Sequence, residues 1–194
     1  MVPPLLSSWF ASDGRPGVED AANPLHPAGS DMRPDVLGPA ELRAVARRLV
    51  PAASELGELS GGDERGWQLL ARTDGYEAWV IGWPPGGSIE LHDHGGSRGV
   101  VQVVSGRLVE TSVIRLGDRL ALRSRPVSAA TRPLGIGATR IHDVTNPGPA
   151  PVLSVHVYSP PLTSMTFYEL DNGALRAGRR ELVGERTESA RRAS

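Results

Sequence analysis

The sequence predicts a mainly β protein, a sandwich or a barrel, with an α-helical segment before it. From residue 67 onward, short β-rich runs are separated by Gly, Pro and Asn. The chain has 23 Gly and 17 Pro, a content that suits short strands joined by many turns. Its 194 residues are enough for one domain with a sizeable core.

The N-terminal part divides into an arm and a helix. Residues 1–36 are Pro-rich without a sustained period, which predicts a poorly ordered arm. Segment 39–56 is predicted to be a helix, with Pro39 in its first turn and Pro51 ending or kinking it. Its apolar residues recur at i, i+3, i+4 and i+7, namely Leu42, Val45, Ala46 and Leu49.

The β-rich part is predicted to complete a single domain over residues 37–170. Within it, Ser105 and Gly106 indicate a hairpin-like turn between two strands. Residues 171–194 are charged and poor in aromatics, which predicts a short helix at most and then a flexible tail. The expected strands are 67–74, 76–85, 88–94, 98–116, 119–128, 139–146 and 151–160.

Composition excludes several classes of function. The net charge is −1 and no basic stripe is interleaved with aromatics, so no nucleic-acid partner is expected. No apolar run approaches 18 residues and the start is not basic, so neither a membrane span nor a signal peptide is expected. The chain has no Cys, which excludes disulfides and thiolate ligands and fits a cytoplasmic location.

The stretch SIELHDH contains two of the five histidines. Residues two apart in a strand point to the same face, so His92 and His94 are expected side by side, with Asp93 pointing the other way. Two imidazoles in that relation can hold one divalent cation.

The surroundings of this pair resemble the two-part motif of the cupin family. The resemblance implies a jelly-roll β-barrel and a third metal ligand, His142, with Asn146 four residues later. The usual glutamate ligand is replaced by Gly99, a departure shared with the thiol dioxygenases, of which cysteine dioxygenase is the best known. The first block matches the cupin spacing at Gly86, His92, His94 and Gly106.

The segment SVHVYSPP closely resembles S-x-H-x-Y-S-P-P of the cysteine dioxygenases. Ser154, His156 and Tyr158 share one face of a strand, so a Ser-His-Tyr hydrogen-bond relay is geometrically natural. The resemblance implies Fe(2+) as cofactor, a small thiol and O2 as reactants, and a sulfinic acid as product. It further implies that these three residues are catalytic and that the protein is a monomer.

The thiol remains open at this stage. L-Cysteine is the first expectation, but the arginine with which cysteine dioxygenases bind the substrate carboxylate aligns with Trp67 or Gln68. Arg72 lies nearby, so Arg72 and Gln68 are the candidate substrate ligands. The alternatives are 3-mercaptopropionate or another small thiol, a cupin enzyme for a non-thiol acid, and a non-catalytic metal-binding sensor.

Overall fold

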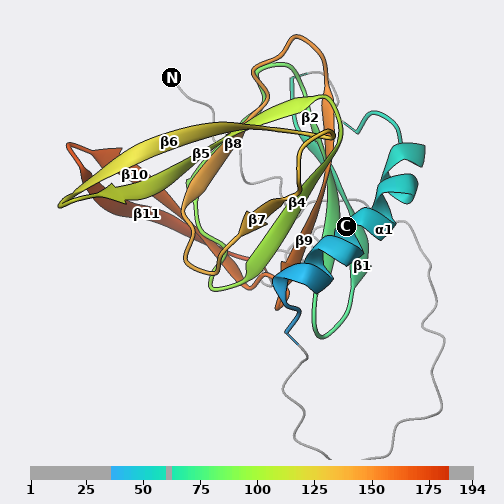
Figure 1. Ribbon diagram of the computed structural model, residues 1–194, viewed down its shortest axis with the longest axis horizontal. Coiled ribbons are helices and arrows are strands. Elements are labelled where there is room, and N and C mark those ends of the chain that lie inside the picture. Colours follow the sequence, from blue (N-terminus) through green and yellow to red (C-terminus); the bar gives the residue numbers. More distant parts are fainter. Residues whose placement is uncertain (1–35, 60–62, 184–194) are drawn as a thin grey trace, which may run out of the picture.

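The computed structural model describes residues 36–59 and 63–183. In this part of the chain, one helix precedes two antiparallel sheets, in agreement with the predicted mainly β fold (Figure 1). The arm up to residue 35 and the end of the predicted tail, 184–194, lie outside the described residues. No helix within the described ranges is long and apolar enough to cross a membrane.

Helix α1 (Pro39–Glu55) covers the outer face of one sheet (Figure 1). Its predicted apolar stripe is confirmed, because Leu42, Val45 and Ala46 are buried against that sheet. Of the two effects expected of Pro51, ending the helix does not occur, since α1 continues to Glu55. The carbonyl that Pro51 leaves without a helical partner belongs to Arg47, which is exposed and so can be hydrated.

The five-stranded sheet lies under α1. Its central strand β9 pairs with β2 on one side and β4 on the other. Val155 and Val157 of β9 face α1, and the alternate residues therefore face the interior. The strand order is β1 (Gly66–Arg72), β2 (Glu77–Trp83), β9 (Val152–Ser159), β4 (Arg98–Ser105) and β7 (Leu134–Ile136).

The six-stranded sheet closes the other side of the barrel. Its inward side chains form the main core with those of the first sheet, and Leu108, Val144 and Phe167 are among them. The strand order is β11 (Ala174–Leu182), β10 (Ser164–Asp171), β3 (Ser88–His92), β8 (His142–Thr145), β5 (Arg107–Leu116) and β6 (Arg119–Ser128). The two sheets pack face to face around one shared core and form the jelly roll that the resemblance implied.

Two details of the sequence interpretation are corrected. Two strands do meet here, with β4 ending at Ser105 and Gly106 lying between β4 and β5. These strands pair in different sheets, so the turn carries the chain across the barrel instead of closing a hairpin. The expectation of a short helix at most after residue 171 is wrong, because β11 pairs along β10. Polar residues are tolerated there because β11 is an edge strand, exposed along most of its length.

Asn146 fastens one end of the barrel. Its amide nitrogen donates to the carbonyl oxygens of Trp83 (3.2 Å), Pro84 (3.0 Å) and Ala150 (2.9 Å), and its side-chain oxygen accepts from Gly148 N at 3.0 Å. The residue is fully buried, so its side chain replaces water as the partner of these backbone groups. This fixes the turn after β2 against the end of β8.

Candidate metal centre

Three histidines meet inside the barrel. His92 ends β3 and His142 begins β8, and the two residues are cross-strand partners. His94 follows two residues after β3 and turns to the same side. One ring nitrogen from each histidine lies within 4.8 Å of the other two, and their exposed fractions are 3%, 1% and 1% for His92, His94 and His142.

The hydrogen bonds of these rings orient them toward a common point. His92 Nδ1 lies 2.7 Å from the backbone carbonyl oxygen of Glu90, and His142 Nδ1 lies 3.0 Å from Glu110 Oε1. Both acceptors require a proton on Nδ1, which leaves Nε2 with its lone pair. Buried His142 Nε2 and both ring nitrogens of His94 have no hydrogen-bond partner among the described residues. Such buried, unsatisfied lone pairs fit a metal ion.

The electrostatics favour neutral imidazoles. Burial, and then the neighbouring His142, lowers the pKa of His92 well below its ordinary value. Burial, and then His92 and His142, does the same to the pKa of His94. Neutral imidazole is the form that ligates metals, and a set without carboxylate or thiolate leaves the full charge on a bound divalent ion. The cluster is therefore a three-histidine metal site in its donor set and burial.

A second chain of polar side chains crosses the interior face of β9. Trp83 Nε1–H donates to Ser154 Oγ at 2.9 Å, and Ser154 Oγ lies 2.9 Å from His156 Nε2. His156 Nδ1 lies 3.1 Å from the Tyr158 hydroxyl. The structure thus joins the three residues of the expected relay and adds Trp83 at its start, a residue that the sequence interpretation did not include in the relay.

The relay has a direction. Burial lowers the pKa of His156 to about 3, so the ring is neutral and carries one proton. Ser154 Oγ accepts from Trp83, and with its own proton directed to His156 Nε2 the ring proton of His156 lies on Nδ1. His156 then donates to the Tyr158 oxygen, so the phenolic proton is free to donate elsewhere.

Tyr158 connects the relay to the histidines. Its ring stacks on His94 with centroids 4.9 Å apart and planes 27° from parallel. Burial, and then the charge of Glu77, raises the pKa of Tyr158, which keeps the phenol protonated. A protonated phenol beside a three-histidine site can donate a hydrogen bond to whatever the metal binds.

Sequence comparison places this site in a known family. The family model described as cysteine dioxygenase type I matches residues 61–171, which is more than half of the chain. The chain belongs to the cysteine dioxygenase type I family. The matched range contains the three clustered histidines and the whole relay.

Solved structures with similar folds are more distant. Oxalate oxidase in complex with the substrate analogue glycolate is 22% identical, with a TM-score of 0.44, over 53% of this chain and 54% of that one. A protein from Thermus thermophilus is 21% identical, with a TM-score of 0.43, over 56% and 93%. A double-stranded β-helix protein from Klebsiella pneumoniae is 18% identical, with a TM-score of 0.46, over 65% and 88%. The chain thus spans about half the length of the oxalate oxidase chain.

Gly99 occupies the position of the glutamate that most metal cupins use as a ligand. A Cβ atom built there would lie 2.8 Å from Tyr158 Cδ1 and 3.0 Å from Cε1. The tyrosine ring therefore fills the space that a side chain at this position needs. In this cysteine dioxygenase family member, Tyr158 takes the space that a carboxylate side chain at position 99 would need, so this position offers no ligand to a metal.

Replacement of Gly99 by alanine is expected to lower the free energy of unfolding by about 1–3 kcal/mol, because the added methyl group overpacks the Tyr158 ring. Urea denaturation of the metal-free protein measures the change. Gly135→Ala is the matched control, since it lies on the paired strand β7 and its added Cβ meets nothing within 4 Å. Equal stability of the two variants would contradict the packing argument.

The two candidate substrate ligands lie on opposite faces of β1. Gln68 is exposed and pairs with Val80, whose side chain packs in the outer core under α1, so Gln68 points away from the barrel interior. Arg72 lies on the inner side but forms an ion pair with the fully buried Glu77, with Nε 3.0 Å from Oε2. Its guanidinium also lies 5.9 Å from the Trp79 ring centroid.

Arg65, which the sequence interpretation did not single out, is the arginine that reaches the site. It directly precedes β1, and its guanidinium carbon lies 5.3 Å from the Trp83 ring centroid. Burial lowers the pKa of Arg65 to about 10, against the opposing effect of Glu90. Its positive charge contributes to the lowered pKa values of both His92 and His156. Arg65 therefore lies within electrostatic range of both the metal site and the relay.

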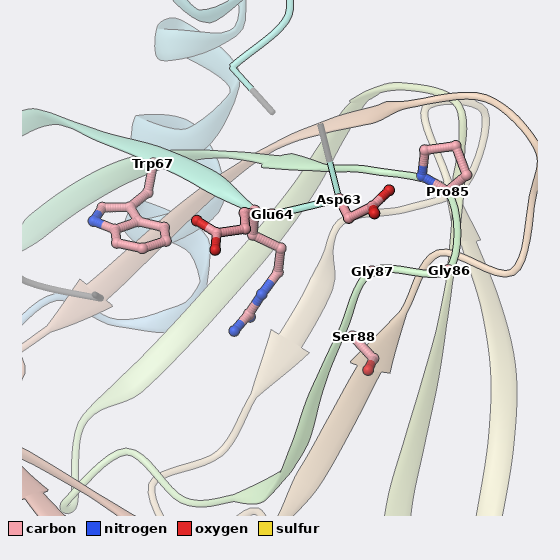
Figure 2. A pocket seen from close by; sticks show the side chains of 8 residues that line it. Asp63, Glu64, Trp67, Pro85, Gly86, Gly87 and Ser88 are labelled. Atoms are coloured by element: carbon pink, nitrogen blue, oxygen red, sulfur yellow. The ribbon is translucent and has the colours of Figure 1, made fainter. Parts of the chain in front are cut away.

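Arg65 also lines a pocket at this end of the barrel. Figure 2 shows the pocket between segment 63–67 and the turn 85–88. Its volume is about 280 Å³. Asp63 and Glu64 contribute carboxylates to the lining, and Trp67 contributes an aromatic face. The lining has charges of both signs but includes none of the three clustered histidines and no residue of the relay, so the pocket is separate from the histidine cluster.

Proposed function

We propose that the protein is an iron(II)-dependent thiol dioxygenase that oxidises a small thiol, L-cysteine first, to its sulfinic acid. The observation that carries the proposal is the joint presence of a buried three-histidine site and the relay that ends at Tyr158, in a chain of the cysteine dioxygenase type I family. The overall reaction adds both atoms of O2 to sulfur, R–SH + O2 giving R–SO2H, so no external reductant is required.

The three histidines and the relay residues have different roles in the proposed reaction. His92, His94 and His142 would hold the ferrous ion, which supplies the redox chemistry that links a thiolate to dioxygen. The free phenolic proton of Tyr158 would donate a hydrogen bond to the bound reactants. His156 and Ser154 keep that proton available, because each donates toward the tyrosine along the relay. The apolar core around the site limits access of water.

The charges of the pocket support an amino acid thiol. A half-buried arginine is suited to bind a carboxylate in a bidentate manner, so Arg65 is our candidate partner for the substrate carboxylate. Asp63 and Glu64 on the pocket lining would favour an ammonium group. Cysteine carries both groups, whereas 3-mercaptopropionate lacks the ammonium group and cysteamine lacks the carboxylate.

Other functions predict different behaviour. A 3-mercaptopropionate dioxygenase would share the chemistry and differ in substrate preference. A cupin enzyme for a non-thiol acid has no use for the specific Ser-His-Tyr relay. A metal-binding sensor without catalytic activity would bind metal and thiol without consuming oxygen. We further propose that the protein acts as a cytoplasmic monomer on its small thiol and O2.

The decisive experiment is oxygen consumption by the iron(II)-loaded protein with L-cysteine, 3-mercaptopropionate and cysteamine in parallel. We expect the fastest uptake with L-cysteine, matched one to one by sulfinate. His142→Ala removes one of three ligands and is expected to abolish both iron binding and uptake. No uptake with any of the thiols, from protein that holds one iron per chain, would reject thiol oxidation.

A further inference from the structure

Glu110 lies in the barrel core directly behind one of the three histidines. Its side chain is 0% exposed, and Oε1 lies 3.0 Å from His142 Nδ1. The residue sits at an inward position of β5, two residues from Ser112, the cross-strand partner of His142. A carboxylate that accepts from Nδ1 of a ligating histidine fixes the ring and makes its other nitrogen a stronger electron donor.

Two arginines form ion pairs with this carboxylate. Arg140 Nε lies 3.1 Å from Oε1, the same oxygen that His142 uses, and Arg125 Nε lies 2.6 Å from Oε2. The hydrogen bonds from His142, Arg140 and Arg125 all end on the two oxygens of this one fully buried carboxylate. The strength with which Glu110 accepts from His142 therefore depends on both arginines.

This arrangement differs from that of the other two ligands. His92 donates to a neutral acceptor, the backbone carbonyl of Glu90. The ring nitrogens of His94 have no hydrogen-bond partner within the described ranges. In this part of the chain, His142 thus receives the support of an anionic group, in a site whose own ligands are all neutral.

We propose that Glu110 is a positioning residue that sets the metal affinity of the site through His142, and that Arg140 restrains this effect. The inference rests on the three-histidine metal site of the proposed function and is independent of the thiol. Removal of the Glu110 charge weakens metal binding, whereas removal of the Arg140 charge strengthens it. A purely structural ion cluster would instead lose affinity with either change.

The first test is the dissociation constant for cobalt(II), measured by competition with a chromophoric chelator. Glu110→Gln is expected to weaken binding by about 10- to 100-fold and to change the visible ligand-field absorption of the bound cobalt. Glu77→Gln is the matched control, since Glu77 is also 0% exposed and paired with one arginine but bonds none of the three histidines. We expect its cobalt affinity to stay within about twofold of wild type.

The second variant is Arg140→Gln, which is expected to bind cobalt several-fold more tightly than wild type. Circular dichroism establishes that each variant is folded. If Glu110→Gln does not fold, Arg140→Gln decides alone, and an unchanged or weakened affinity would overturn the proposal. An unchanged affinity in folded Glu110→Gln would overturn it as well. If these affinities change as expected while wild type oxidises no thiol, the proposed function fails and this inference stands.

Discussion

Acidification from pH 7.5 to pH 5.5 is expected to lower the free energy of unfolding of the metal-free protein by about 4 kcal/mol. His92, His94 and His156 are buried and have lowered pKa values, that of His156 being about 3. In the unfolded chain they titrate near pH 6.5, so the unfolded state binds more protons than the native state. The stabilisation is complete above pH 6.5 and is lost as the pH falls toward the native pKa values.

The size of this effect follows from the three groups. One pH unit below its unfolded pKa, each histidine that stays neutral in the native state costs about 1.4 kcal/mol. Urea denaturation at several pH values measures the slope, and pH 5.5 stays above the ordinary range of carboxyl groups. His156→Gln removes one of the three groups, so its loss should be about 3 kcal/mol. Stability that is independent of pH in this window would refute neutral buried histidines.

The sequence predicted the parts of the site that depend on strand periodicity. Ser154, His156 and Tyr158 recur at alternate positions of β9, and alternation alone places such side chains on one face. His92 and His94 also recur at alternate positions, but β3 ends at His92, so His94 comes to the same side from the segment that follows the strand. The structure brings both sets together. His142 lies beside His92 because β3 pairs with β8. The sequence interpretation took this third ligand from the family resemblance, because no local pattern indicates it.

The residues that the sequence interpretation missed are those whose role depends on contacts across the barrel. Glu110 occupies an inward position of β5 between Leu108 and Ser112. A charged residue at an inward position is visible in the sequence and could have identified Glu110 as a candidate. Arg65 precedes the strand, where no periodicity indicates its direction. Gln68 was chosen by its distance along the chain, but the pairing of β1 with β2 turns it to the outer face.

Arg65→Gln is expected to lower kcat/KM for L-cysteine by about 100-fold, which corresponds to about 2.7 kcal/mol. The reason is the loss of a charge-assisted, bidentate partner for the substrate carboxylate in a buried setting. Cysteamine has no carboxylate, so its kcat/KM should change by less than about threefold. Steady-state oxygen uptake with both thiols measures this difference, and Arg65→Lys should recover part of the loss.

Arg72→Gln is the control that separates the two candidate arginines. Arg72 is held by Glu77 and is about half exposed, with 47% of its side chain accessible, so its removal should leave the ratio of the two thiols unchanged. A loss specific to cysteine in Arg72→Gln, with none in Arg65→Gln, would restore the interpretation from sequence. The opposite result would mean that the carboxylate partner comes from the segment before β1, where Arg65 lies half-buried over Trp83, between the pocket and the relay.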